Sequence, residues 1–149
     1  MIKKMTTTRN GFTLIEILLS LSILAIFISV GIPIYQSLQN TNDLDVAENI
    51  ALQSFRRAQS LSRAVDSDST WGTKIQNGSV TIFKGASFSA RATDFDEVFE
   101  ISTLIIPTGV TEIVYSKFDG FPNTTGTLTL TSNNEVRTIV INQNGTLSY

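Results

Sequence analysis

The chain has 149 residues, enough for one domain, with 11 basic and 13 acidic side chains. It contains no cysteine and no histidine, which excludes disulfides, thiolate nucleophiles, imidazole bases and zinc sites built from those ligands. The near-balance of charge gives no support to a nucleic-acid binder held by bulk charge.

Positive charge is concentrated at the N-terminus. Lys3, Lys4 and Arg9 precede Gly11, and the remaining chain carries 8 basic and 13 acidic residues, a formal charge of −5. The 24 residues from Phe12 to Tyr35 then contain a single charged side chain, Glu16. A helix of this length spans about 36 Å, against a hydrocarbon thickness of about 30 Å. We expect one membrane crossing with a cytoplasmic N-terminus.

Three other interpretations compete with a specialised membrane segment. A secretory signal has a shorter apolar region, followed by small residues at its cleavage site, and fits poorly. A soluble buried helix would have to hide apolar surface around its whole circumference, which a domain of this size cannot do. An uncleaved signal anchor explains everything except Gly11 and Glu16.

The sequence Gly11-Phe12-Thr13-Leu14-Ile15-Glu16 resembles the processing motif of type IV prepilins and pseudopilins. The resemblance implies that prepilin peptidase removes a leader of residues 1–11 by cutting between Gly11 and Phe12, and that Phe12 becomes the N-methylated N-terminus. Glycine also suits a cut site because it lets an extended chain lie close to a protease.

Glu16 is the one ionisable group in the apolar run, and a carboxylate in hydrocarbon is costly unless it is paired. The resemblance implies that it pairs with the freed Phe12 amine of a neighbouring subunit during assembly. The alternative is a polar residue tolerated near the membrane interface.

Gly31 and Pro33 lie near the outer end of the apolar segment, where proline removes a backbone donor. A break in the helix is expected here. It is either a simple kink or, as the resemblance implies, a segment that loosens when subunits pack into a filament.

The helical pattern continues over residues 36–65, so one helix of about 80 Å is predicted for residues 12–65. Apolar residues recur at helical spacing on one face, which should be covered by the following domain. They are Leu44, Ala47, Ala51, Phe55, Ala58, Leu61 and Val65. Arg56, Arg57 and Arg63 point mainly elsewhere, and a solvated face is favoured over a binding patch.

Residues 66–149 are predicted to form a β-rich head. Strands are expected at Ser79–Lys84, Val98–Ile106, Glu112–Ser116, Gly126–Thr131, Val136–Asn142 and Thr146–Ser148. Turns are expected at Asn77-Gly78, Pro107-Thr108-Gly109, Ser132-Asn133-Asn134 and Asn144-Gly145. The last two long strands should form a hairpin, with Leu128 and Leu130 on one side and Val136, Ile139 and Ile141 on the other strand. One face of it should pack on the apolar stripe of the helix.

Short motifs in the head resemble the globular domain of H-type minor pseudopilins. They are Arg56-Arg57-Ala58-Gln59-Ser60, Trp71-Gly72, Phe83-Lys84-Gly85, and Arg137-Thr138-Ile139-Val140-Ile141 followed by Asn144-Gly145. Trp71 alone is better explained as a core anchor. The chain departs from many Gram-negative pilins in lacking their C-terminal cysteine pair.

Other chemistry finds little support. Asp94, Asp96, Glu97 and Glu100 match no calcium-binding loop, so a solvated acidic loop is favoured and no metal or other cofactor is predicted. No nucleophile has a base to activate it, and we predict that the protein is not an enzyme. Nucleic-acid binding would have to use Arg56, Arg57, Arg63 and Lys74 and is disfavoured.

The sequence therefore predicts an α+β, pilin-like fold, a long N-terminal helix with an antiparallel β domain packed on its outer half. The expected function is that of a structural subunit of a type IV pilus or type II secretion-like pseudopilus. The alternative is a minor tip pilin that binds DNA, a surface or a secreted cargo. Expected partners are prepilin peptidase, other pilin subunits, the assembly platform and its motor. The precursor would span the inner membrane once before entering an extracytoplasmic filament.

Overall fold

Apolar side chains from one helix and two antiparallel sheets form the core of the protein. The computed structural model describes residues 11–133 and 135–149, apart from the side chains at positions 30, 31 and 33. It divides into two compact units, one ending at Leu38 and the other Gln39–Tyr149. The expected leader, except Gly11, lies outside the described residues.

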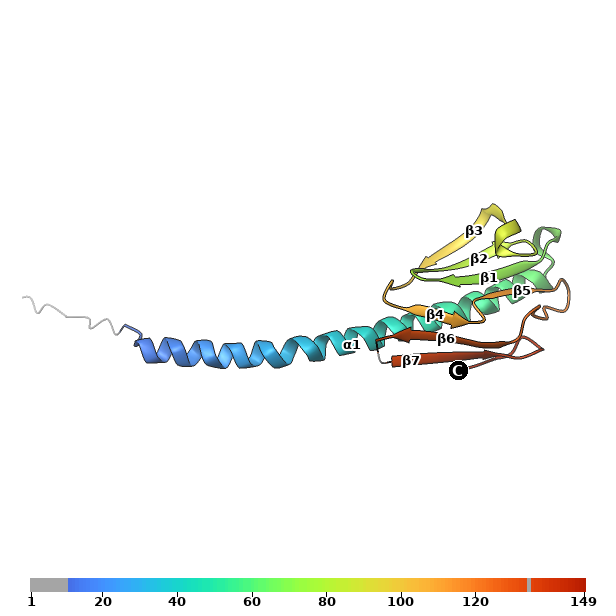
Figure 1. Cartoon of the computed structure of the whole chain (residues 1–149). Coiled ribbons are helices and arrows are strands. Elements are labelled where there is room, and N and C mark those ends of the chain that lie inside the picture. The colour runs from blue at the N-terminus through green and yellow to red at the C-terminus, as the bar shows by residue number, and fades with distance from the viewer. Residues whose placement is uncertain (1–10, 134) are drawn as a thin grey trace, which may run out of the picture. The chain divides into compact units, whose positions relative to one another are not determined.

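Helix α1 is Leu14–Arg63, and strands follow it in chain order (Figure 1). They are β1 (Trp71–Gln76), β2 (Ser79–Lys84), β3 (Ala92–Glu100), β4 (Ile106–Gly109), β5 (Glu112–Tyr115), β6 (Gly126–Ser132), β7 (Glu135–Ile141) and β8 (Leu147–Ser148). A short 3₁₀ turn, η1 (Asp66–Asp68), lies between α1 and β1, and a second, η2 (Phe88–Ala90), lies between β2 and β3. The strands form two four-stranded sheets, ordered β3-β2-β1-β5 and β4-β6-β7-β8.

The apolar stripe of α1 forms one wall of the core in Gln39–Tyr149. Leu44, Ala47, Ala51, Phe55 and Ala58 are all buried in one cluster with residues from both sheets. Leu61 is partly buried against that cluster. The predicted α+β arrangement, a long helix packed against antiparallel sheet, is confirmed.

Trp71 ties the first strand to the end of the helix. The Trp71 backbone N–H donates to Ser62 Oγ at 2.8 Å, and the indole Nε1 donates to the Asp66 carbonyl oxygen at 3.1 Å. Its side chain is buried in the core. Trp71 is therefore a core anchor, as predicted, with its one polar atom satisfied.

The predicted strand β2 is confirmed with the same limits, and β5, β6 and β7 are confirmed with small shifts at their ends. Strand β8 is shorter than expected. The prediction of one strand over Val98–Ile106 is wrong, because the chain leaves one sheet after Glu100 and enters the other at Ile106. The Asn77 side-chain amide holds this crossing by donating to the Thr103 and Ile105 carbonyl oxygens at 2.7 and 3.0 Å.

The expected turn at Pro107-Thr108-Gly109 is also wrong, since these residues belong to β4. Strand β4 pairs only with β6 and is an edge of its sheet. An edge strand needs backbone donors on one side alone, so proline is tolerated there.

Val136 does not share the buried face of the hairpin. In the register of β6 and β7, Leu128 faces Ile139 and Gly126 faces Ile141, which places residues of odd number in β7 toward the core. Val136 lies on the other face and is 48% exposed. Alternation along the strand explains this, since successive side chains point to opposite faces.

Gly109 occupies a position that no larger residue can take without a shift. Its φ is +81°, and a Cβ atom would overlap the Thr127 carbonyl oxygen. Gly109→Ala is expected to lower the free energy of unfolding of a Gln39–Tyr149 fragment by about 3 kcal/mol. Gly78 is the control, since its φ is +84° but its nearest neighbour would be a side-chain carbon of Thr103 at 3.2 Å.

Gly78→Ala should cost about 1–2 kcal/mol, the backbone strain alone. Urea unfolding followed by the fluorescence of Trp71, the one tryptophan, measures both. Equal losses in the two variants would contradict the steric assignment at Gly109.

Candidate functional site

The segment before the helix is the first candidate site. Gly11, Phe12 and Thr13 precede α1 and are exposed. A Cβ atom at Gly11 would meet no atom within 4 Å. The described part of the chain therefore leaves room for a larger side chain at position 11. If glycine is required there, the requirement comes from a partner protein.

Glu16 and Thr13 cap the helix reciprocally. The Glu16 backbone N–H donates to Thr13 Oγ1 at 3.3 Å, and the Thr13 backbone N–H donates to Glu16 Oε2 at 3.5 Å. This is a capping box, in which two backbone donors at a helix start are satisfied by side chains. Thr13 was missed as a site residue, although its spacing to Glu16, Thr-x-x-Glu, is visible in the sequence.

The capping box leaves the charge of Glu16 without a counter-ion. Among the residues that the structure describes, no cation forms an ion pair with Glu16, and the next charged side chain along the sequence is Asp43. The partial positive charge at the N-terminus of a helix stabilises a carboxylate, which offsets part of the cost of placing an ionised group in hydrocarbon. Full neutralisation requires a cation from elsewhere.

The described part of α1 between Glu16 and Leu38 is mainly apolar and exposed. An 18-residue window of α1 has a mean hydropathy of 2.6 and none of it is buried, so by length and composition the helix could cross a membrane. The hydroxyls of Ser20, Ser22 and Ser29 donate to carbonyl oxygens of the same helix at 2.7–2.9 Å. The hydroxyl donors are therefore satisfied within the helix and need no hydrogen bond to water in an apolar environment.

The helix assignment continues through positions 31 and 33. The structure does not describe the side chains at these two positions. The predicted break at Gly31 and Pro33 therefore stays a prediction.

Comparison with known families bears on this same segment. Residues 7–32 match the family model described as the prokaryotic N-terminal methylation motif. The chain carries a prepilin-type N-terminus. This motif supports an assignment to the type IV pilin and pseudopilin family and implies processing by prepilin peptidase and assembly with other pilin subunits. The exposed apolar helix is consistent with a membrane-anchored precursor.

The matched residues end before Gln39, so the motif says nothing of the head. No curated protein and no solved structure matches the chain. The helix packed against antiparallel sheets is nonetheless a pilin-like arrangement.

Several basic side chains of the head are engaged in ion pairs. Arg57 binds Glu97 through two hydrogen bonds of 2.6 and 2.7 Å. Lys74 Nζ lies 3.3 Å from a Glu112 carboxylate oxygen. Two of the four residues suggested for contacting nucleic acid are thus already neutralised within the head.

The acidic residues around Asp94 do not form the solvated loop that was expected. They lie in strand β3, where Asp96 accepts a 2.7 Å hydrogen bond from Arg91 and Glu97 pairs with Arg57. Within the described chain, no group of three or more acidic residues is placed to hold a metal ion.

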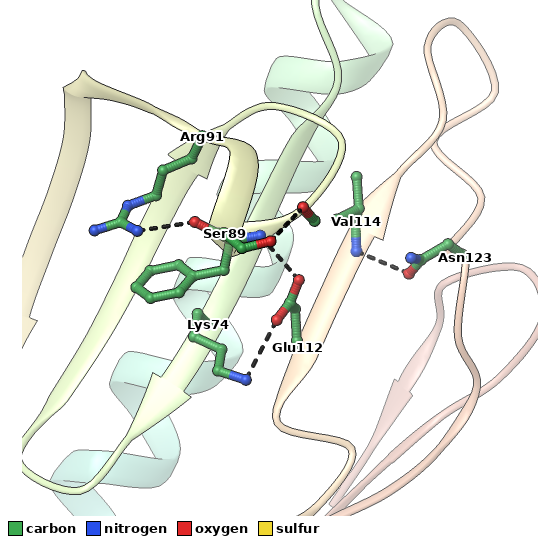
Figure 2. A network of polar contacts seen from close by, with 8 residues as sticks. Lys74, Ser89, Arg91, Glu112, Val114 and Asn123 are labelled. Atoms are coloured by element: carbon green, nitrogen blue, oxygen red, sulfur yellow. Dashed lines mark hydrogen bonds and ion pairs between the residues drawn. The ribbon is translucent and has the colours of Figure 1, made fainter.

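A polar network crosses the outer face of the first sheet (Figure 2). Glu112 accepts from Lys74 Nζ and, at 2.9 Å, from the backbone N–H of Phe88 in η2. Arg91 stacks over the Phe88 ring and donates to the Phe88 carbonyl oxygen at 2.8 Å. The network therefore fixes η2 against β1 and β5.

Three side chains of the head, Asp68, Arg57 and Tyr115, have shifted pKa values. The hydrogen bond from Lys117 lowers the pKa of the Asp68 carboxyl, and the hydrogen bond to Glu97 raises the pKa of the Arg57 guanidinium. Burial raises the pKa of the Tyr115 hydroxyl above its ordinary value. Each shift moves the titration further from neutral pH, so none creates an acid or base suited to catalysis there.

Proposed function

We propose that this protein is a structural subunit of a type IV pilus or a type II secretion-like pseudopilus. Prepilin peptidase cuts the precursor between Gly11 and Phe12, Phe12 is N-methylated, and subunits assemble through their N-terminal helices. The observation that carries the proposal is the lone charge of Glu16, four residues beyond Phe12, at the start of an exposed apolar helix.

Physical chemistry connects cleavage to assembly. The cut creates an amine at Phe12, and methylation leaves that amine cationic at neutral pH. A carboxylate at the edge of hydrocarbon attracts such a cation by about 4 kcal/mol at contact distance and an effective dielectric near 20. A neighbouring subunit's Phe12 amine would thus neutralise Glu16 when the two helices pack. The inner-membrane precursor would then be drawn into an extracytoplasmic filament by the assembly platform and its motor.

Substitutions at Gly11 test the cut site. Gly11→Ala should slow processing modestly, because a methyl group meets no atom of this chain and only slightly crowds the peptidase. Gly11→Leu should block processing. Co-expression with prepilin peptidase, followed by the mass of the membrane-bound chain, gives the processed fraction.

Position 10 offers a matched control for the cut. Asn10→Leu places the same side chain one residue before Gly11 and should be processed far more than Gly11→Leu. Processing of Gly11→Leu at the wild-type rate would remove Gly11 from the proposed site.

One feature of the head favours the second candidate, a minor subunit at a filament tip. The loop between β5 and β6 exposes Phe118 and Phe121, although the backbone of Phe118 has a φ of +66° that is costly for a bulky residue. Two hydrogen bonds hold the loop. The Phe118 N–H donates to the Ser62 carbonyl oxygen, and the Phe121 N–H donates to Ser116 Oγ. Strained backbone that is held rigidly is often found at binding sites.

Abundance distinguishes the two roles. A major subunit would dominate the protein in sheared filaments, whereas a tip subunit, including one of the H-type minor pseudopilin kind, would be a trace component. Quantitative mass spectrometry of sheared filaments against total membrane protein measures the ratio.

A further inference from the structure

A polar pocket in the head contains two arginines and no acidic residue. The pocket has a volume of about 270 Å³ and lies between α1 and the turn that joins β7 to β8. Arg56 and Arg63 are seven residues apart, about two helical turns, and so lie on the same side of α1. Its lining residues are Arg56, Gln59, Arg63, Asn144, Gly145, Thr146 and Leu147.

The walls of this pocket are fixed by hydrogen bonds. Gln59 Nε2 donates to the Gly120 carbonyl oxygen at 2.9 Å and to the Asn144 carbonyl oxygen at 3.4 Å. Arg63 Nε donates to the Asp119 carbonyl oxygen at 3.0 Å. A Cβ atom at Gly145 would overlap Gln59 Nε2, so the turn approaches the helix closely.

The guanidinium donors in the pocket are largely unused. A guanidinium has five N–H donors, and the contact to Asp119 uses one of those on Arg63. Arg56 makes no hydrogen bond or ion pair within the part of the chain that the structure describes. Two arginines in a fixed polar pocket are suited to a planar oxyanion, which a guanidinium binds bidentately.

The other basic side chains of the head have partners. Lys84 lies over the Phe95 ring, 4.2 Å from its centroid. Five more form ion pairs: Arg57 with Glu97, Lys74 with Glu112, Arg91 with Asp96, Lys117 with Asp68, and Arg137 with Asp45. Within the described residues, Arg56 and Arg63 are therefore the two cations of the head that have neither a carboxylate nor an aromatic ring as a partner.

Six acidic side chains of the head form no ion pair within the described residues, namely Asp43, Asp66, Asp94, Glu100, Asp119 and Glu135. Two of them share one strand. Asp94 and Glu100 are exposed on β3 and form no ion pair with the described residues. Strand β3 is an edge of the first sheet, whereas the pocket adjoins the second sheet. A contact between the two surfaces on different copies is heterologous, and such a contact extends into an open filament when its rotation does not close a ring.

We propose that the pocket of Arg56 and Arg63 binds a carboxylate of Asp94 or Glu100 from a second copy of this chain. The contact deepens the proposed filament function and rests on it, because it joins the heads of neighbouring subunits. A single pocket with two arginines fits one carboxylate better than a nucleic-acid backbone, which requires several phosphate contacts.

Directional crosslinking tests this contact in full-length chains. The protein contains no cysteine, so Asn144→Cys at the pocket rim and Val98→Cys on β3, both exposed positions, can be placed in two differently tagged copies. Oxidation of the co-expressed copies in membranes should give a disulfide-linked dimer carrying both tags. Adding Arg56→Gln and Arg63→Gln to the copy with Cys at position 144 should reduce this dimer about tenfold, the loss expected for charge-assisted hydrogen bonds.

The same two substitutions in the copy with Cys at position 98 are the matched control. They change the total charge of the two copies by the same amount but leave Arg56 and Arg63 in the copy whose pocket is crosslinked through position 144. The crosslinked dimer should therefore persist. Arg57→Gln in the copy with Cys at position 144 should also have little effect, because Arg57 is paired with Glu97 in its own head. A dimer that is insensitive to the pocket substitutions, or equally sensitive in either copy, would overturn the proposal.

Two further readouts separate this proposal from its alternatives. The mass of the mature N-terminus in each variant reports processing at Gly11, so a failure of the proposed function is seen independently of the crosslink. Binding of a labelled DNA duplex by the wild-type chain that is lost with Arg56→Gln and Arg63→Gln would assign the pocket to phosphate and overturn its assignment to a carboxylate.

Discussion

Replacing Glu16 by alanine is expected to leave cleavage after Gly11 intact and to reduce the amount of assembled filament at least tenfold. The carboxylate would lose an attraction of about 4 kcal/mol for the Phe12 amine of its neighbour, which exceeds the 1.4 kcal/mol that corresponds to tenfold. Sheared filaments and membranes, quantified separately by immunoblot and normalised to processed chain, measure assembly.

The capping box supplies the control for this prediction. Glu16→Gln keeps a side-chain oxygen that can accept a hydrogen bond from the Thr13 N–H but removes the negative charge. Its filament assembly should therefore be reduced as strongly as that of Glu16→Ala. Thr13→Ala removes the hydroxyl that accepts from the Glu16 N–H, costs about 1 kcal/mol of helix stability and keeps the charge, so filaments should form. Normal filaments from Glu16→Gln would show that capping, and not charge, is the role of Glu16.

Replacing Phe55 by alanine is expected to lower the free energy of unfolding of the head by about 3–5 kcal/mol. Phe55 is fully buried where α1 meets both sheets, and its removal leaves a cavity that the packed core cannot close. Urea unfolding of a Gln39–Tyr149 fragment, followed by Trp71 fluorescence, measures the loss.

Val46→Ala is the comparison on the exposed face of the same helix, since Val46 is 48% exposed. It should change the free energy of unfolding by less than about 0.5 kcal/mol. Similar losses for Phe55→Ala and Val46→Ala would contradict the assignment of the buried stripe.

The stripe of α1 could be predicted because helical spacing is a local property of the sequence. Leu44 to Ala58 recur at three and four residues, and all five stripe residues in this stretch are buried as expected. The β head was less predictable, because its strand limits depend on which sheet each segment joins. The residues after Glu100 are apolar enough for a strand, yet they cross between sheets under the side chain of Asn77.

The two candidate sites differ in the same way. The N-terminal motif lies within six consecutive residues, so Gly11, Phe12 and Glu16 could be named from the sequence, and Thr-x-x-Glu could have added Thr13. The pocket could not be predicted, because it brings Arg56 together with a turn at Asn144 that lies far along the chain. The pairing of Arg57 with Glu97, which distinguishes it from Arg56, likewise depends on the tertiary fold.

Intact mass spectrometry of the chain recovered from membranes and from sheared filaments tests the central claim most directly. The account predicts a mature form that lacks residues 1–11 and begins at Phe12, with one added methyl group on its N-terminal amine. A filament or membrane form that retains Met1, or that is cut at any other bond, would contradict it.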